Sequence, residues 1–257
     1  MRAQSIRFVT LALFASVAFG QTPADGNVER VFHFVHTEAI QAMMEIATTV
    51  RTISDIRHMS SDTEEKTLTM RGSAVQIALA EWLFNNLDKS ANTRPTQVST
   101  PEYRVSDSAD DRAQVFYLTH TETMQHLPEV ATTVRSMVGT RSLFTYRALS
   151  AVVVRGTSAD LALAGWLLND LDQSTNPQRV QDSAVHIYRV AGSDDVVRVF
   201  YLSHSGTVAS FQKIVTQVRT TVQIRRLFTY NEPRAAAARG TDDQIAMADI
   251  LFKELGQ

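Results

Sequence analysis

Hydrophobic and polar positions follow the same order three times along the chain. Each repeat opens with a short hydrophobic run that ends in histidine: VFHFVH at 31–36, VFYLTH at 115–120 and VFYLSH at 199–204. Runs of this length, rich in β-branched and aromatic residues, predict a strand. A shift of 84 residues aligns 31–88, 115–172 and 199–256 without a gap. Because solenoid repeats usually span about 20 to 50 residues, each repeat is predicted to be a small domain of its own.

The pattern after this first strand predicts two helices and a hairpin. Hydrophobic residues recur at helical spacing at Ile40, Met43, Ala47 and Val50; at Met124, Leu127, Ala131 and Val134; and at Val208, Phe211, Val215 and Val218. Two short strands follow, such as RSLFTY and SAVVVRG in the second repeat, and a second helix closes each repeat, as in SADLALAGWLLNDLD. This order predicts an α+β fold of three tandem β-α-β-β-α domains, each a small sheet with two helices on one face.

Two polar linkers, 89–111 and 173–195, separate the repeats, and each carries proline near its start. Both contain Tyr-Arg-Val before an Asp-Asp pair, so we expect Tyr103–Val105 and Tyr188–Val190 to be short strands that pair with the first strand of the next domain. The first repeat is expected to lack this strand. The predicted domains are 27–89, 101–173 and 186–257.

A glycine followed by a hydroxyl residue ends the last strand of each repeat. The pairs are Gly72-Ser73, Gly156-Thr157 and Gly240-Thr241. Three residues after the hydroxyl stands Gln76, Asp160 or Gln244, which is the spacing of a capping box at a helix N-terminus. Glycine is expected to supply the sharp turn out of the strand. We therefore interpret these residues as a structural turn and cap, and not as a binding loop.

Residues 1–20 have the pattern of a secretory signal peptide. Arg2 and Arg7 precede an apolar run from Phe8 to Phe19, and the small residues Ala18 and Gly20 precede the expected cleavage site before Gln21. No later stretch approaches the roughly 20 apolar residues that a membrane-spanning helix needs. The mature chain is therefore predicted to be exported to the periplasm, without an integral membrane segment, and associated with the outer membrane through a partner if at all.

The composition and the absence of known motifs exclude several kinds of site and activity. The chain has no cysteine, which excludes disulfides and thiolate zinc sites. Its 25 Lys and Arg residues against 27 Asp and Glu residues do not provide the basic surface of a nucleic-acid-binding protein. The GxSxG, HExxH, Walker and GxGxxG motifs are absent. We therefore predict no catalytic residues, no cofactor and no enzymatic activity.

Three histidines stand at the same position of the repeats, namely His36, His120 and His204. If the three domains surrounded a common axis, their imidazoles would be candidate metal ligands. The alternative interpretation is local, because a histidine at a strand-to-helix junction caps the helix or forms a nearby hydrogen bond. No carboxylate partner at a fixed spacing is evident from the sequence. A periplasmic protein that binds a metal or small ligand through these histidines is the second function that the sequence leaves open.

Each repeat resembles the N-terminal repeat domains of the secretins, the ring-forming outer-membrane channels of bacterial secretion systems and pili. The resemblance is carried by VFYLTHTETM, LFTYRALSAVVVRGT and LAGWLLNDLD in the second repeat. The terminal pairs Leu87-Asp88 and Leu171-Asp172 also match, whereas the third repeat departs from the pattern with Leu255-Gly256. The resemblance covers most of the chain after residue 20, three times over.

This resemblance implies a non-enzymatic, ring-building module in which a helix of one subunit packs against the sheet of the next. The chain ends after the third repeat, so we expect a module without the channel domain. Its expected partners are copies of itself or a protein complex of the cell envelope. The same element order is found in KH-type RNA-binding modules, but these need a GxxG loop and a basic surface, and the sequence has neither.

Overall fold

The computed structural model describes residues 27–90, 98–105, 110–120, 126–140, 142–172, 187–202 and 205–256, which form three units. The first contains β1 (Asn27–His33), α1 (Ile40–Ile53), β2 (His58–Asp62), β3 (Thr67–Ser73) and α2 (Ala74–Leu87). The second contains β4 (Tyr103–Arg104), β5 (Arg112–Tyr117), α3 (His126–Val138), β6 (Leu143–Tyr146), the 3-10 turn η1 (Arg147–Leu149), β7 (Ala151–Gly156) and α4 (Ser158–Leu171). The third contains β8 (Ile187–Arg189), β9 (Val196–Tyr201), α5 (Val208–Val222), β10 (Arg226–Tyr230), β11 (Ala235–Gly240) and α6 (Asp242–Leu255).

Each unit builds one antiparallel sheet. Sheet 1 has the strand order β1-β3-β2, sheet 2 the order β4-β5-β7-β6, and sheet 3 the order β10-β11-β9-β8. The predicted α+β fold of three tandem β-α-β-β-α units is confirmed. The short strands expected in the linkers are also present, with Tyr103 opposite Ala113 and Tyr188 opposite Val197. The predicted signal peptide lies outside the described residues.

No helix in the described ranges is long and apolar enough to cross a membrane.

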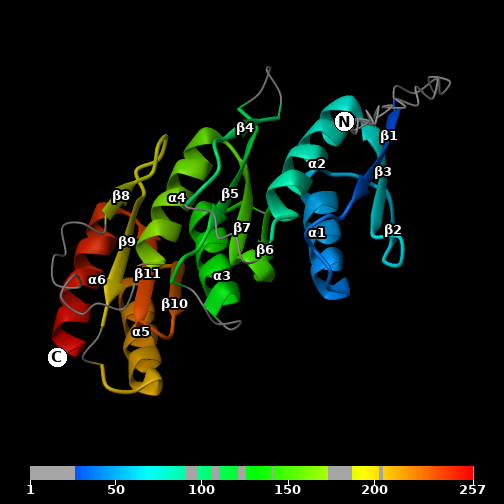
Figure 1. The fold of residues 1–257 in the computed structure, drawn as a ribbon. Coiled ribbons are helices and arrows are strands. Elements are labelled where there is room, and N and C mark those ends of the chain that lie inside the picture. Colours follow the sequence, from blue (N-terminus) through cyan, green and yellow to red (C-terminus); the bar gives the residue numbers. More distant parts are fainter. Residues whose placement is uncertain are drawn as a thin grey trace, which may run out of the picture.

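The three units stack so that sheets and helix pairs alternate along the molecule (Figure 1). Helix α1 packs on its own sheet and also against β6 and β7 of sheet 2, and α3 in the same way contacts β10 and β11 of sheet 3. One hydrophobic cluster therefore joins the first unit to sheet 2, and another joins the second unit to sheet 3. We call the side of a sheet away from its own helices its outer face.

This stacking explains why the first strand of the second and third units ends in an uninterrupted hydrophobic run, at 115–118 and 199–202. Phe116 and Leu118 belong to the cluster beneath their own helices, whereas Val115 and Tyr117 on the alternate positions belong to the cluster of the first unit. A strand buried on both faces has no polar alternation. Sheet 1 has no helix pair on its outer face within the described residues, and there the strand carries the exposed Val31 and His33.

Candidate interaction surfaces

The helix-to-sheet contact between units is built twice, and we call the two instances joints. The first joint places α1 and α2 against the outer face of sheet 2, and the second places α3 and α4 against the outer face of sheet 3. In each joint a tryptophan of the second helix, α2 or α4, lies beside a tyrosine of the short linker strand, β4 or β8. The ring centroids of Trp82 and Tyr103 are 5.0 Å apart, and those of Trp166 and Tyr188 are 5.5 Å apart. Both aromatic pairs lie between units.

An arginine at the end of the last hairpin strand anchors each joint to the preceding unit. In the first joint Arg155 donates from Nη1 to the carbonyl oxygen of Ile53, near the end of α1, at 2.6 Å, and the carboxylate of Asp111 holds the other side of its guanidinium. In the second joint Arg239 donates to the carbonyl oxygen of Met137 at 2.7 Å and is held by Asp195. The arginine therefore binds an unpaired carbonyl of the helix C-terminus, where the helix dipole favours a cation.

A glutamate near the start of the helix contacts the hairpin of the next unit in both joints. Glu45 accepts a hydrogen bond from the backbone amide of Arg147 at 3.1 Å, and its carboxylate lies 3.6 Å from the Arg147 guanidinium. Glu129 accepts from the backbone amide and the side-chain amide of Asn231, both at 3.0 Å. The two joints therefore have a polar contact at each end, with apolar packing between them.

A tyrosine hydroxyl adds a third polar contact. Tyr117 donates to the carbonyl oxygen of Asn86 at 3.0 Å, and Tyr201 donates to the carbonyl oxygen of Asp170 at 2.9 Å. Burial raises the pKa of Tyr117 to about 12 and also raises the pKa of Tyr201. Both hydroxyls therefore remain protonated donors near neutral pH.

The outer face of sheet 1 is equivalent to the faces of sheets 2 and 3 that form the joints, but its side chains are more polar. Glu29, His33 and Thr69 stand where sheet 2 has Ala113, Tyr117 and Val153. Together with Arg71 at the strand end, these substitutions make the face polar. A polar face of this kind is usual for a sheet whose outward side meets water.

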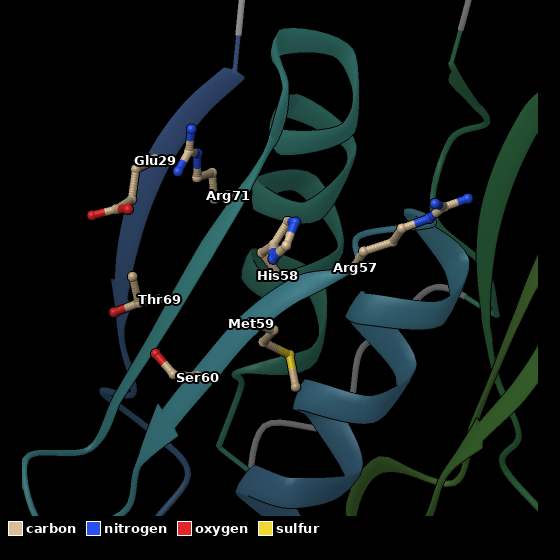
Figure 2. Close-up of a pocket in the computed structure, with 7 residues that line it drawn as sticks. All are labelled: Glu29, Arg57, His58, Met59, Ser60, Thr69 and Arg71. Atoms are coloured by element: carbon tan, nitrogen blue, oxygen red, sulfur yellow. The ribbon is translucent and has the colours of Figure 1, made fainter. Parts of the chain in front are cut away.

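A pocket of about 380 Å³ opens on this outer face. Its lining residues are Glu29, Arg57, His58, Met59, Ser60, Thr69 and Arg71. Figure 2 shows that the Arg57 side chain extends away from the other six, toward the end of α1. The guanidinium of Arg71 has no side-chain hydrogen bond or ion pair within the described ranges, in contrast to Arg155 and Arg239, its counterparts in the two joints.

The helix face at the opposite end of the stack, formed by α5 and α6, is uncovered in the described part of the chain. We call it the α5–α6 face and define it by Ile214, Gln217, Thr221, Met247, Ile250 and Leu251, whose equivalents in the other two helix pairs are buried or partly buried. Met247 is 50% exposed and Ile250 is 52% exposed. Ile250 stands at the position of Trp82 and Trp166, so a site that is packed between units in the two joints is open at this end of the stack.

Two of the repeated histidines, His36 and His120, lie in the loop after the first strand, beside an aspartate that binds the amides of this loop. The carboxylate of Asp88 accepts hydrogen bonds from the backbone amides of Val35, His36 and Thr37, and its oxygen lies 3.9 Å from Nδ1 of His36. Asp172 accepts from the amides of Thr119 and His120 in the same way. The expectation that these histidines have no carboxylate partner at a fixed spacing is therefore wrong, because the aspartate follows 52 residues later in both units.

Within the described residues, the structure does not support a metal site at His36 and His120. The side chains of His36 and His120 are about half exposed, each beside its own aspartate. His204 lies outside the described residues. Among the residues that the structure places, no three His, Cys, Asp or Glu side chains are close enough together to hold a metal ion.

The glycine–hydroxyl pairs lie at the starts of α2, α4 and α6. The side chain of Ser73 accepts from the amide of Gln76 while the Gln76 side chain accepts from the amide of Ser73, and the same reciprocal pair joins Thr157 to Asp160 and Thr241 to Gln244. The preceding glycines, Gly72, Gly156 and Gly240, do not have a positive φ. Their need for glycine is one of space: a Cβ at Gly156 would stand 2.8 Å from the Asp160 carboxylate that folds back over it.

Sequence reasoning missed the residues of the joints. The signal was present, because an arginine precedes the glycine in all three repeats, at Arg71, Arg155 and Arg239. Its meaning depends on which helix C-terminus lies opposite, and that is a property of the stacking.

No family model matches the chain, and no curated protein matches it. Among solved structures, it is similar to ExeD of Aeromonas hydrophila, with 14% identity over 90% of this chain and 41% of that chain, at a TM-score of 0.22. It is also similar to the N-terminal domain of the secretin XcpQ from Pseudomonas aeruginosa, with 12% identity over 90% of this chain and 100% of that chain, at a TM-score of 0.29. A chain of the ETEC pilotin–secretin complex AspS–GspD matches with 13% identity over 91% of this chain and 38% of that chain, at a TM-score of 0.22.

The chain thus spans less than half the length of ExeD and of the matched chain in the pilotin–secretin complex. Two of these structures have the word secretin in their names.

Proposed function

We propose that the chain is an exported, non-enzymatic interaction module that assembles through helix-to-sheet joints, with copies of itself or with a secretion or pilus complex of the cell envelope. One observation carries this proposal. The same joint is made twice inside the chain with the same kinds of contact, and the two surfaces that would continue it are exposed at the opposite ends of the stack.

The chemistry of the joint suits assembly. Its arginine and its tyrosine bind backbone carbonyl oxygens, and its glutamate binds backbone amides, so the contact depends on the fold of the partner more than on the partner's side chains. Apolar side chains between these contacts provide the buried area. A partner with an exposed sheet face or helix pair of the same kind would therefore meet complementary groups.

The cellular location in this proposal comes from the sequence. Residues 1–20 have the charge, apolar run and small residues of a signal peptide, and the motifs of the repeats resemble those of secretin N-terminal domains. We place the mature chain in the periplasm, where such domains act. Expression with its leader and N-terminal sequencing of the mature protein tests this placement, with Gln21 as the expected first residue.

Interaction is tested on the mature chain by light scattering across a concentration range and by affinity capture from extracts of its own cell envelope. We expect either a mass that rises with concentration or the capture of a defined envelope protein. Ile250→Asp, which puts a charge on the α5–α6 face, should weaken these interactions, whereas Lys253→Glu is the matched control, since position 253 and its equivalents 85 and 169 are exposed in all three units. A strict monomer that retrieves no envelope protein would contradict the proposal.

A further inference from the structure

We propose that the α5–α6 face of one copy binds the outer face of sheet 1 in a second copy, head to tail, in the geometry of the two internal joints. This inference rests on the proposed function, because it names the surface and the partner for the assembly. It is argued from three pairs of polar groups. Each pair stands at positions where the internal joints make a contact, and each is complementary between the two ends of the molecule.

The first pair is Arg71 with the carbonyl oxygen of Thr221. Arg71 is the equivalent of Arg155 and Arg239, and Thr221 is the equivalent of Ile53 and Met137, whose carbonyl oxygens those arginines bind. Arg71 is exposed at the end of sheet 1, where Asn27 replaces the aspartate that holds Arg155 and Arg239. Its guanidinium therefore lies at the place from which its counterparts reach the helix C-terminus of the neighbouring unit.

The second pair has a lysine on the helix side, where the internal joints have a glutamate, and two glutamates on the hairpin side. Lys213 on α5 replaces Glu45 and Glu129, the glutamates that accept hydrogen bonds from the hairpin of the next unit. The β2–β3 hairpin, which would face Lys213, carries Glu64 and Glu65. Their equivalents contact the preceding unit: Glu232 lies 2.6 Å from His126, and Leu149 is buried in the first joint. Thr63 stands where Arg147 and Asn231 contact the glutamates, and the next two residues, Glu64 and Glu65, carry the charge opposite to that of Lys213. Opposite charges on the two faces favour attraction between copies.

The third pair is His33 with Glu254. His33 replaces the tyrosines Tyr117 and Tyr201, and Glu254 stands at the position of Asn86 and Asp170, whose carbonyl oxygens accept from those tyrosines. An imidazole N–H at this position is placed to donate to the backbone or to the carboxylate of Glu254. Both residues are exposed in the single copy, so neither face has a cost from a buried charge before association.

Apolar contact completes the joint but is reduced. Val31, which is 50% exposed, keeps the hydrophobic position of Val115 and Val199, and it would meet the face that carries Met247 and Ile250. The remaining positions on the outer face of sheet 1 are polar. We therefore expect a reversible association, weaker than the internal joints. Because the two surfaces differ, the contact is heterologous and leads to rings or open chains of copies.

Charge reversal tests the second pair directly, on the full mature chain. Lys213→Glu and the double variant Glu64→Lys/Glu65→Lys should each weaken self-association roughly three- to tenfold, as expected for like charges across an exposed contact. Combining the three substitutions should restore it. Lys253→Glu is the control on the same helix pair and should leave association unchanged. Dissociation constants from analytical ultracentrifugation give the measurement.

Carbodiimide coupling provides a second readout that does not depend on affinity. Lys213 should couple to Glu64 or Glu65 in a mixture of ¹⁴N- and ¹⁵N-labelled protein, and mass spectrometry should find the two isotopes in one linked peptide. The chain has few lysines, so the assignment is direct.

The outcomes separate this inference from the proposed function. Self-association that none of the charge reversals changes, or that the triple variant does not restore, overturns the head-to-tail joint while leaving an assembly module in place. A chain that stays monomeric but captures an envelope protein also overturns the second copy as occupant. Only a monomer without any partner contradicts both.

Discussion

The carboxylate of Asp88 gathers the three successive amides of Val35, His36 and Thr37, and its side chain is buried where α2 ends. These amides belong to the loop between the first strand and the first helix, and no strand or helix pairs them. A buried amide without a partner is unfavourable, so this aspartate fixes the path of the loop. The Leu-Asp pair that closes the first two repeats is thus a structural contact between the two ends of a unit.

Substitution of Asp88 by alanine should destabilise the chain by about 3 kcal/mol, because hydrogen bonds to a charged acceptor are lost and buried amides remain. Urea unfolding followed by circular dichroism measures the change. Asp62→Ala is the matched control, since Asp62 also accepts from two amides, those of Glu64 and Glu65, but in an exposed hairpin. Its cost should stay below about 1 kcal/mol. Equal costs at the two positions would show that burial of the Asp88 loop is not the cause.

The sequence marked the histidine beside this loop and missed the aspartate as its partner. A repeated histidine attracts attention because imidazoles bind metals, whereas an aspartate at the end of a helix looks like an ordinary surface residue. The link between His36 and Asp88 spans 52 residues, and it depends on α2 returning to the start of its own unit. Periodicity cannot supply that information.

At the scale of elements, each joint depends on one arginine that connects a strand end to a helix C-terminus. Arg155 has two types of partner, the carbonyl oxygen of Ile53 and the carboxylate of Asp111. Removal of the guanidinium takes this hydrogen-bond donor away from the carbonyl oxygen and from the carboxylate, in a partly buried place. The equivalent Arg71 makes no such contact within the described ranges, which offers a comparison between identical residues at identical strand positions.

Arg155→Met should therefore lower the free energy of unfolding by about 2 to 3 kcal/mol, whereas Arg71→Met should change it by less than about 0.5 kcal/mol in dilute solution. Chemical denaturation at low protein concentration keeps association out of the measurement. A large loss in Arg71→Met would mean that Arg71 has a structural partner inside its own unit, and the two arginines would then not differ by the presence of a joint.

The order of elements could be predicted because it depends on local patterns. Helical spacing, hydrophobic strands and the hydroxyl at each helix start are all properties of short segments, and the structure has each element in its expected order. The side on which a residue is buried could not be predicted in the same way. Phe144 and Tyr146 alternate with Leu143 along β6, but only the stack shows that the aromatic side meets α1 of the preceding unit.

At the scale of the whole molecule, the hydrophobic clusters do not coincide with the units. The first cluster contains the core of the first unit together with Val115, Val153 and other side chains of sheet 2. A small domain buries a modest fraction of its surface, so contact with a neighbour is a large part of its stability. The units should therefore lose their structure together.

The two tryptophans of the chain make this cooperativity measurable, because Trp82 lies at the first joint and Trp166 at the second. In the unaltered protein, tryptophan fluorescence and far-ultraviolet circular dichroism should report one coincident urea transition. Val153→Asp buries a charge in the first joint and should separate the two signals, with part of the fluorescence change coming first. Thr69→Asp, the equivalent substitution on the open face of sheet 1, should leave them coincident. Separate transitions in the unaltered protein would show that the joints are too weak to couple the units, and the stack would then be three independent domains in contact.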